Sequence, residues 1–330
     1  MKKPLIVLTG PTAVGKTALS IELAKRIGGE IISADSMQVY RHMDIGTAKI
    51  KKEEMQGIKH YLIDELEPEE DFNVVKFQEY THKYMEEIYS KGKIPILTGG
   101  TGFYIQAVLY GVDFKEAEED NACRDSLLAL AKEKGAQYLH DRLKEVDPAA
   151  AEAIHPNNVK RVIRALEYHT QTGEQISAHN EEQRQKESPY NFCYFVLNTE
   201  RKILYDRINQ RVDVMMKEGL TEEVKKLLDR GLTSDMVSMQ GLGYKEIIEY
   251  LKGDTTLEQA VEAIKQETRH FAKRQITWFK REKEVIWILK DDYKKEEEIL
   301  DALLKSMKEK GITASERVRQ NRETAIGTNV

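Results

Sequence analysis

Along its first third, the chain alternates short strand-like runs with longer segments of helical periodicity. The strand-like runs are rich in apolar residues and lie at 5–8, 30–34, 61–64 and 94–98. Between the first two runs, Leu19 and Leu23 are spaced four apart, as on one face of a helix, and Gly28-Gly29 marks its end. Strands that alternate with helices predict an α/β fold whose parallel sheet is covered by helices on both faces.

Helical periodicity without strand signals begins near Phe114 and continues to about Gly173. This segment opens with the polar, acidic residues 115–120 and ends in a hydrophilic connector at 177–188. An apolar run at 191–197 then restores the strand pattern. We therefore expect an all-helical insertion domain between two parts of the sheet domain.

This organisation divides the chain into four parts. After the insertion, helices are expected near 203–217, 221–230 and 257–283, with a last strand at 285–289. Beyond Lys305 hardly any large apolar residue remains, which predicts a polar, flexible tail. The expected parts are the first part of the α/β core at 1–113, the helical insertion at 114–190, the second part of the core with basic helices at 191–305, and the tail at 306–330.

Composition and charge narrow the class of protein. Of the 330 residues, 40% are hydrophobic and 32% charged, as in globular domains. Because the formal net charge is -5, a nucleic-acid partner would have to be held by a local basic patch. The apolar runs are too short for a transmembrane helix or a signal-peptide core, and Cys123 and Cys193 cannot build a disulfide framework. We expect a cytoplasmic protein without a membrane partner.

The clearest motif lies between the first strand and the first helix. It fits the spacing G-x-x-x-x-G-K-[ST], in which glycines let backbone N–H groups turn toward an anion and a lysine adds a full positive charge. The threonine at its end offers a hydroxyl to a magnesium ion. The predicted phosphate cradle consists of Gly10, Pro11, Thr12, Ala13, Val14, Gly15, Lys16 and Thr17, with Thr17 as the magnesium ligand. The motif leaves open whether the bound group is a triphosphate or a diphosphate ester.

Asp35 ends the second expected strand, at the sheet edge that would also carry the phosphate cradle. Three interpretations compete for this carboxylate. It could bind magnesium, it could act as a general base, or it could cap a turn or helix.

Several further stretches are similar to tRNA dimethylallyltransferases, and the matches run from about residue 5 to 289. Apart from the cradle, the similar stretches are 35–40, 43–49, 99–104, 157–167, 207–212, 240–245 and 272–279. The resemblance implies a P-loop-type parallel sheet and an enzyme that transfers the dimethylallyl group from dimethylallyl diphosphate to N6 of adenosine 37 of tRNA, 3′ of the anticodon, releasing pyrophosphate. No Cys/His finger follows residue 290, as in the bacterial form.

The resemblance also implies catalytic roles. The cradle would hold the diphosphate together with Mg²⁺, and Arg211 would reach the same phosphates. Asp35 would accept the proton of N6, and Thr101 would contact the leaving oxygen and the target nucleotide. Chemistry agrees with these roles, because cleavage of the allylic C–O bond places negative charge on pyrophosphate, and an aromatic amine is a poor nucleophile without a base.

The target base would have to leave the stack of the anticodon loop to reach the pocket. A local basic segment at 269–283 carries six basic residues and one acidic residue, although basic helices are often merely solvated. The residues that the resemblance implies as tRNA contacts are Asp35, Ser36, Met37, Gln38, Thr101, Arg124, Val159, Lys160, Arg161, Val162, Ile163, Gln240, Gly241, Leu242, Gly243, Tyr244, Lys245, Lys273 and Arg274. We expect a monomer that binds the anticodon stem-loop and dimethylallyl diphosphate.

Two other functions share the phosphate cradle. A nucleotide or small-molecule kinase would use the same loop and sheet, and the insertion offers Arg161 and Arg164 for an arginine-bearing lid. An RNA-binding switch would hydrolyse a nucleotide without modifying RNA. Transfer of a labelled dimethylallyl group to RNA distinguishes both from the prenyltransferase.

Overall fold

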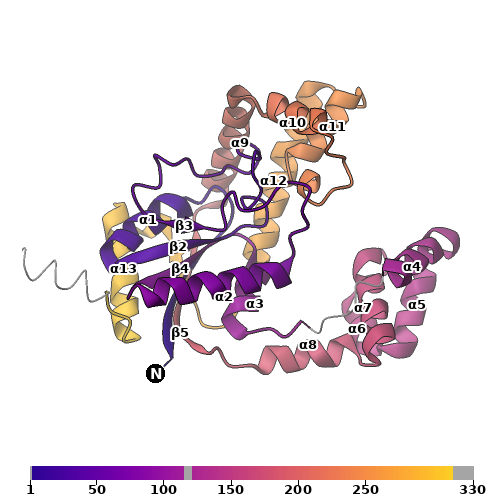
Figure 1. Ribbon diagram of the computed structural model, residues 1–330, viewed down its shortest axis with the longest axis horizontal. Coiled ribbons are helices and arrows are strands. Elements are labelled where there is room, and N and C mark those ends of the chain that lie inside the picture. Colours follow the sequence, from indigo (N-terminus) through magenta and orange to yellow (C-terminus); the bar gives the residue numbers. More distant parts are fainter. Residues whose placement is uncertain (1, 115–120, 315–330) are drawn as a thin grey trace, which may run out of the picture. The chain divides into compact units, whose positions relative to one another are not determined.

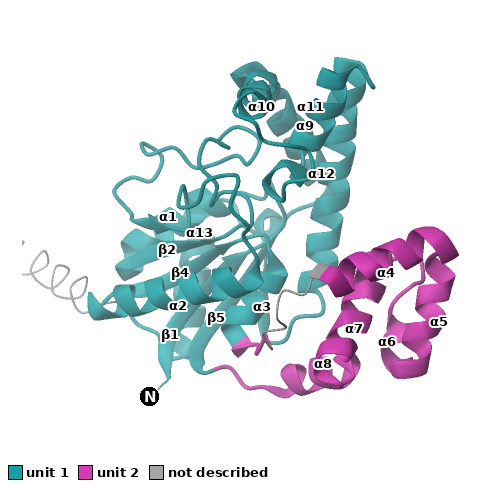
Figure 2. Ribbon diagram, turned by 45° about the vertical axis from the view of Figure 1, so that its right-hand side comes forward, with its two compact units in different colours: residues 1–109, 189–330 teal, residues 110–188 magenta. Residues whose placement is uncertain are grey.

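The computed structural model describes residues 2–114 and 121–314 and contains two compact units. Residues 110–188 form one unit, and the segments on either side of them form the other (Figure 2). None of the described helices combines the length and the apolar character that crossing a membrane would require.

The larger unit is built on one sheet of six parallel strands, in the order β3-β2-β4-β1-β5-β6. The strands are β1 (Lys3–Thr9), β2 (Gly29–Ala34), β3 (His60–Tyr61), β4 (Ile94–Gly99), β5 (Tyr190–Asn198) and β6 (Val285–Leu289). The central strand β1 pairs with both β4 and β5, so that Thr9 lies opposite Gly99 on one side and Val196 on the other. The predicted P-loop-type sheet flanked by helices is confirmed.

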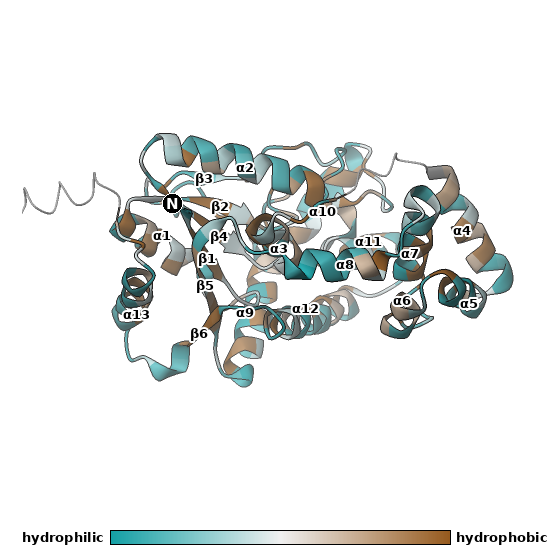
Figure 3. Cartoon of the chain, turned by 90° about the horizontal axis from the view of Figure 1, so that it is seen from below, coloured by the Kyte–Doolittle hydropathy of each residue, from teal (hydrophilic) through white to brown (hydrophobic). Residues whose placement is uncertain are grey.

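Alternate residues of the buried strands face opposite helical layers. On one face, Ile6 and Leu8 join a core cluster with residues of α1 (Lys16–Ile27) and α13 (Glu296–Glu309). The hydropathy colouring of Figure 3 shows hydrophobic residues along β5 and β6 and long hydrophilic stretches on the outer side of the helices. Burying both faces of the sheet is what makes its strands nearly continuous apolar runs.

Helices α2 (Val74–Ser90) and α3 (Gly102–Tyr110) belong to the opposite face of the sheet. They pack against each other through Phe77 and Tyr104, whose stacked rings have centroids 4.6 Å apart. The start of α3 follows directly on β4, and this junction places the glycine-rich segment 99–102 at the carboxyl edge of the sheet.

Four helices stand above the carboxyl ends of the strands in Figure 1: α9 (Arg201–Glu218), α10 (Leu220–Asp229), α11 (Tyr244–Lys252) and α12 (Leu257–Phe279). Helix α12 packs against α9 and α11. Its N-terminus is closed by a capping box, in which the Thr256 hydroxyl accepts from the Gln259 N–H and the Gln259 side chain accepts from the Thr256 N–H. A well-capped helix is a stiff support for the side chains that it presents.

Two sequence predictions are corrected by the structure. The strand expected at 61–64 ends at Tyr61, because Leu62 and Asp64 adopt left-handed backbone conformations (φ of 60° and 55°) that leave the sheet. The polar tail starts later than 306, because α13 continues to Glu309 and its face buries Met307. Ile312 is also buried, whereas residues 315–330 lie outside the described part of the chain.

The smaller unit is entirely helical over its described residues. It contains α4 (Asn121–Lys134), α5 (Ala136–Val146), α6 (Pro148–Ala153), α7 (Val159–Thr172) and α8 (Ile176–Gln185). Its core includes Leu139, Leu143 and Val162, all fully buried. Buried Asp147 accepts hydrogen bonds from the N–H of Ala150 at 3.0 Å and from the hydroxyl of Ser177 at 2.6 Å, which ties α6 to α8. The acidic segment 115–120 lies outside the described residues.

Candidate active site

The loop between β1 and α1 has the backbone conformation of an anion cradle. Gly10 and Gly15 adopt φ values of 147° and 95°, and even Ala13 is left-handed at 63°. A side chain at position 10 would also clash with the main-chain carbonyl of Leu197 on β5, so only glycine fits there. Residues with positive φ within such a loop turn backbone N–H groups toward one side, which is the geometry that binds phosphate.

Lys16 closes over this loop. Its Nζ donates to the carbonyl of Gly10 at 3.0 Å and to that of Pro11 at 2.9 Å. Burial, together with the smaller effect of the positive charge of Arg211, lowers the pKa of Lys16 to about 7, while the negative charge of Asp35 acts to raise it. The lysine is therefore poised for an anion, since a bound phosphate would favour its charged form.

Asp35 follows the last residue of β2, Ala34, which lies opposite Gly99 at the end of β4. Its Oδ1 accepts hydrogen bonds from the N–H of Met37 at 2.9 Å and of Gln38 at 3.3 Å, so one oxygen caps a turn. The carboxylate also lines a pocket. The turn-capping interpretation and a functional role are thus compatible, because a carboxylate has two oxygens.

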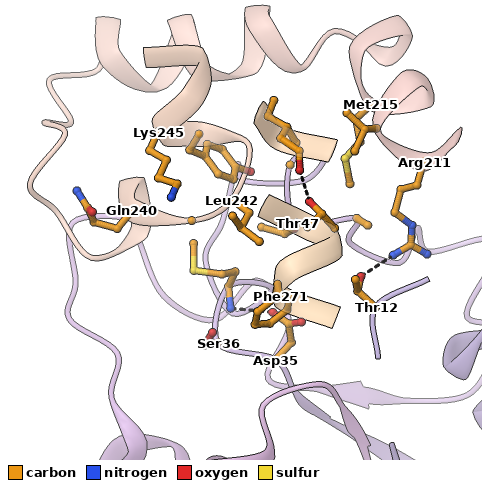
Figure 4. Close-up of a pocket in the computed structure, with 18 of the residues that line it drawn as sticks. Thr12, Asp35, Ser36, Thr47, Arg211, Met215, Gln240, Leu242, Lys245 and Phe271 are labelled. Atoms are coloured by element: carbon orange, nitrogen blue, oxygen red, sulfur yellow. Dashed lines mark hydrogen bonds between the residues drawn. The ribbon is translucent and has the colours of Figure 1, made fainter. Parts of the chain in front are cut away.

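A pocket of about 400 Å³ opens between the sheet edge and the helices above it (Figure 4). In Figure 4, Asp35 and Ser36 lie at its base, Arg211 and Thr12 face each other on one side, and Lys245 lies on the other. The residues that line it are Thr12, Asp35, Ser36, Met37, Gly46, Thr47, Ala48, Thr101, Arg211, Val212, Met215, Val237, Gln240, Gly241, Leu242, Tyr244, Lys245, Ile264, Thr268, Phe271 and Arg274. The pocket therefore combines a carboxylate, cations and an apolar wall.

Arg211 reaches the cradle from α9. Its Nη1 donates to the hydroxyl of Thr12 at 3.4 Å. Burial lowers the pKa of Arg211, whereas the negative charge of Asp35 acts to raise it. Of the two arginines that the sequence spaces four apart on this helix, Arg211 lines the pocket, and Arg207 is exposed.

The upper wall of the pocket is held by Glu223 of α10, a residue that sequence reasoning missed. Its carboxylate accepts from the N–H groups of Asp44 at 2.9 Å, Ile45 at 2.8 Å and Gly46 at 3.1 Å. It also accepts from the Tyr244 hydroxyl at 2.7 Å. A side chain at Gly46 would meet the ring of Tyr244, so glycine permits this close approach. The loop at 44–48 is thereby fixed over the pocket.

Helix α12 turns one face to the pocket. Ile264, Thr268, Phe271 and Arg274 follow each other at helical spacing of three or four residues, and all four line the cavity. The basic pair expected on this helix is therefore divided: Arg274 lines the pocket, whereas Lys273 is exposed beside it. Reading the same spacing in the sequence would have found the apolar members Ile264 and Phe271.

The other tRNA contacts implied for the larger unit gather at this pocket with few exceptions. Ser36, Met37, Thr101, Gln240, Gly241, Leu242, Tyr244 and Lys245 line it. Gln38 lies behind the lining, where its amide nitrogen is 3.3 Å from the carbonyl of Thr47. Gly243 adopts a φ of 94° at the start of α11 and positions its neighbours.

The implied tRNA contacts of the smaller unit lie on α4 and α7. Lys160 and Arg161 are exposed in the first turn of α7, whereas the side chains of Val162 and Ile163 are buried in the core of the unit. Val159 packs against the same core. The guanidinium of Arg124 lies 3.1 Å from the buried carboxylate of Glu167, which also pairs with Arg164 at 3.3 Å. A single buried glutamate thus orients two arginines that are half-exposed.

The donor set at the cradle suits magnesium bound through its substrate. Thr17 is exposed in the first turn of α1, directly after Lys16 of the cradle. Within the described residues, no three His, Cys, Asp or Glu side chains are grouped so as to hold a metal ion alone. Magnesium commonly keeps several waters and takes only one or two protein oxygens in addition to substrate phosphates, and a single threonine hydroxyl fits that pattern.

Comparison with known proteins gives one consistent family. Residues 38–282 match the family model described as IPP transferase. A tRNA dimethylallyltransferase of Lachnoclostridium phytofermentans is 62% identical over 310 residues, which cover 94% of this chain and 99% of that protein. The tRNA dimethylallyltransferase of Acetivibrio thermocellus is 54% identical over 299 residues, covering 91% and 96% of the two chains.

Solved structures agree with the sequence comparison. The crystal structure of a full-length tRNA isopentenylpyrophosphate transferase from Bacillus halodurans is 47% identical and superposes with a TM-score of 0.71, covering 94% of this chain and 98% of the other. A eukaryotic dimethylallyltransferase acting on tRNA is 32% identical with a TM-score of 0.72, covering 84% of this chain and 70% of the other.

Proposed function

This chain belongs to the IPP transferase family together with the tRNA dimethylallyltransferases, and we propose that its pocket transfers the dimethylallyl group of dimethylallyl diphosphate to N6 of adenosine 37 in tRNA. The reaction class, dimethylallyl transfer to tRNA, follows from membership of this family. One observation supports the finer assignment: Asp35, Arg211 and the cradle residue Thr12 line the same cavity as a set of apolar side chains.

The cradle is suited to hold a diphosphate that leaves as pyrophosphate. The N–H groups of the loop, the ammonium of Lys16 and the guanidinium of Arg211 converge on one region, as the hydrogen bond between Arg211 and Thr12 indicates. As the allylic C–O bond breaks, negative charge grows on the departing oxygens. Donors that are already in place stabilise that charge more in the transition state than in the ground state, and this difference lowers the barrier.

The apolar wall is suited to the five-carbon group. Val212 and Met215 come from α9, Leu242 from the segment before α11, and Ile264 and Phe271 from α12. Positive charge develops on the allylic carbon during the reaction, and water is the competing nucleophile. An apolar lining keeps water from that carbon and leaves the amine of the incoming base as the nucleophile.

Asp35 is assigned as the base that accepts the proton from N6. The N6–C1 bond forms as the C1–O bond breaks, the pyrophosphate takes the bonding pair, and the surplus proton on N6 passes to the Asp35 carboxylate. Its Oδ1 is fixed by two backbone N–H groups, so the carboxylate is oriented before substrate arrives. Thr101, whose N–H donates to the Ala34 carbonyl at 3.2 Å, is assigned to contact the leaving oxygen and the target nucleotide.

Magnesium is proposed as the cofactor, with Thr17 as its protein ligand beside the diphosphate oxygens. When bound, it would neutralise part of the charge of the leaving pyrophosphate. The residues of the chain that would share this task are Lys16 and Arg211.

The RNA is proposed to bind through exposed cations around this pocket and on the helical unit. Lys245 and Arg274 line the cavity itself, and Lys273 is exposed on α12. Arg124 and the first turn of α7 with Lys160 and Arg161 are the proposed contacts of the smaller unit. Phosphate contacts of this kind give a strong dependence of RNA affinity on salt.

Two properties follow from the substrate. We propose that the enzyme acts as a monomer. Because the substrate is tRNA, we place the enzyme in the cytoplasm. Neither assignment requires a partner protein.

A transfer assay tests the proposal. Purified protein is incubated with Mg²⁺, dimethylallyl diphosphate labelled in its five-carbon part, and an unmodified anticodon stem-loop whose anticodon is followed by adenosine. We expect label in the RNA. A matched stem-loop with purine riboside at position 37, which lacks the exocyclic amine, should take up none. Label in the second RNA, or in neither, contradicts the assignment of N6 as the acceptor.

A further inference from the structure

Gln275 of α12 joins the two glycine-rich segments of the site. Its Oε1 accepts a hydrogen bond from the N–H of Thr12 in the cradle at 2.9 Å. Its Nε2 donates to the carbonyl of Gly100, in the segment that carries Thr101, at 3.0 Å. One amide side chain thus spans two loops that are about ninety positions apart in the sequence and that follow different strands, β1 and β4.

The bridge requires an amide at this position. Thr12 presents a donor and Gly100 an acceptor, and only a side chain with both an acceptor and a donor at its end can satisfy the two together. The fit is tight, because a side chain added at Gly100 would collide with the Gln275 amide nitrogen. Only 6% of the surface of Gln275 is exposed to solvent.

Gln275 differs in its burial from its neighbours on the same helix. Lys273 and Arg274 are exposed and are proposed to contact RNA, whereas a residue buried to this degree cannot contact RNA directly. Gln275 also does not line the pocket. Its contacts are with the backbone that carries Thr12 and Thr101, both of which do line it.

We infer that Gln275 is a positioning residue, which fixes the spacing between the phosphate cradle and Thr101 and thereby the alignment of the allylic diphosphate with its leaving-group contacts. This role rests on the proposed function of the pocket. Each loop has its own strand and helix, so each can bind its ligand group without the bridge. What the bridge adds is that both loops contact the same substrate at one fixed separation.

A misplacement of about 1 Å between reacting groups can lower a rate by about a hundredfold while leaving ground-state binding largely intact. We therefore expect Gln275→Met, which keeps length and lacks both hydrogen bonds, to lower kcat for prenyl transfer by about 10- to 100-fold. KM for dimethylallyl diphosphate and KM for the stem-loop should each stay within about threefold of wild type. Gln266→Met, an exposed glutamine on the same helix, is the matched control and should retain wild-type kinetics.

Lys273→Met changes the exposed neighbour two positions earlier and should raise KM for the stem-loop with little change in kcat. If Gln275 only packed the protein interior, Gln275→Met would lower the unfolding temperature, but it would not lower kcat at an unchanged KM. Unfolding temperatures of all variants are measured alongside the kinetics.

A second variant disturbs the same bridge from the other loop. Gly100→Ala keeps glutamine at position 275, but the added methyl group would displace its amide nitrogen from the Gly100 carbonyl. It should reproduce the loss of kcat, and the double variant should lose no more than about threefold beyond the worse single variant, because both act on one contact. This variant keeps the test decisive where Gln275→Met fails to fold.

The outcomes are distinct. Loss of kcat with conserved KM in the single variants, without further loss in the double variant, supports the positioning role. Wild-type kcat in a folded Gln275→Met protein, or losses that multiply in the double variant, overturns it. A wild-type enzyme that transfers no label overturns the proposed function, and this role with it.

Discussion

The guanidinium of Arg211 donates to the hydroxyl of Thr12 over 3.4 Å, although the two residues are 199 positions apart in the chain. The phosphate cradle is consequently more than a loop between a strand and a helix, since α9 brings a second cation to it. Two cations beside the loop suit a diphosphate, whose charge increases as it leaves.

Arg211→Gln should lower kcat/KM for dimethylallyl diphosphate by about a hundredfold, because an uncompensated charge on the leaving group costs roughly 3 kcal/mol. Arg207→Gln is the control, since Arg207 is exposed on the same helix and does not line the pocket. Steady-state kinetics of both variants, with saturating stem-loop, make the comparison. Equal effects of the two substitutions would argue against a specific role for Arg211.

Asp35→Asn separates the two interpretations of this residue. The amide oxygen of asparagine can still accept from the N–H groups of Met37 and Gln38, so the turn should survive. Loss of the base should lower the single-turnover rate by about 10²- to 10⁴-fold, while RNA affinity measured by filter binding stays within about threefold. A single-turnover rate like that of wild type would leave Asp35 as a turn cap only.

The affinity of the cradle for a diphosphate should depend on pH through Lys16. Burial lowers its pKa from 10.5 to about 7, so in the ligand-free protein it is largely neutral above that pH. Binding of a diphosphate then requires proton uptake, and affinity should fall by up to about tenfold per pH unit above about pH 7. Titration calorimetry with an inert diphosphate analogue measures this slope, which Lys16→Met should abolish. A wild-type affinity independent of pH would contradict the assignment.

The same lysine should make the free energy of unfolding rise with pH, whereas it makes the affinity for a diphosphate fall. Its folded pKa lies below its unfolded value, so between about pH 7 and 10.5 the unfolded chain holds more protons on this group. The contribution of Lys16 to the free energy of unfolding should therefore rise as pH rises through that window, and be least favourable below it. Urea unfolding of wild type and Lys16→Met at matched pH values gives the difference.

Glu223 should matter for stability and activity together. Glu223→Gln leaves one acceptor oxygen where two now serve four donors, three of them the N–H groups of residues 44–46 and the fourth the hydroxyl of Tyr244. We expect a loss of about 2 kcal/mol in the free energy of unfolding, because several partly buried donors lose a charged partner. Glu222→Gln, a change in the exposed neighbour, should cost less than about 0.5 kcal/mol. Similar losses in both variants would remove Glu223 from the pocket's supporting structure.

The sequence predicts those parts of the site that are continuous in the chain. The cradle at 10–17 is one run of residues, and its spacing already implies the left-handed glycines that the structure contains. Asp35 and Thr101 could be placed at the same edge because parallel strands end together. Sheet and helices were predictable for the same reason, since their apolar periodicity is local.

The remaining parts of the site depend on contacts between distant segments. Neither Gln275 nor Glu223 carries a local signal, because a single glutamine or glutamate on a helix is ordinarily a solvated residue. Their partners lie 263 positions away in the case of Thr12 and 177 to 179 positions away in the case of the 44–46 loop. The strand at 61–64 was overestimated because the left-handed turns at Leu62 and Asp64 are not visible in a β-favouring composition.

The most direct measurement compares two ligands for the cradle. Titration calorimetry of the wild-type protein with Mg²⁺ is carried out with dimethylallyl thiolodiphosphate, an unreactive analogue of the five-carbon ester, and with a non-hydrolysable analogue of adenosine triphosphate. If the cavity holds a departing pyrophosphate beside an apolar wall, the five-carbon analogue should bind at least about a hundredfold more tightly. Tighter binding of the triphosphate analogue would contradict that arrangement and favour phosphoryl transfer.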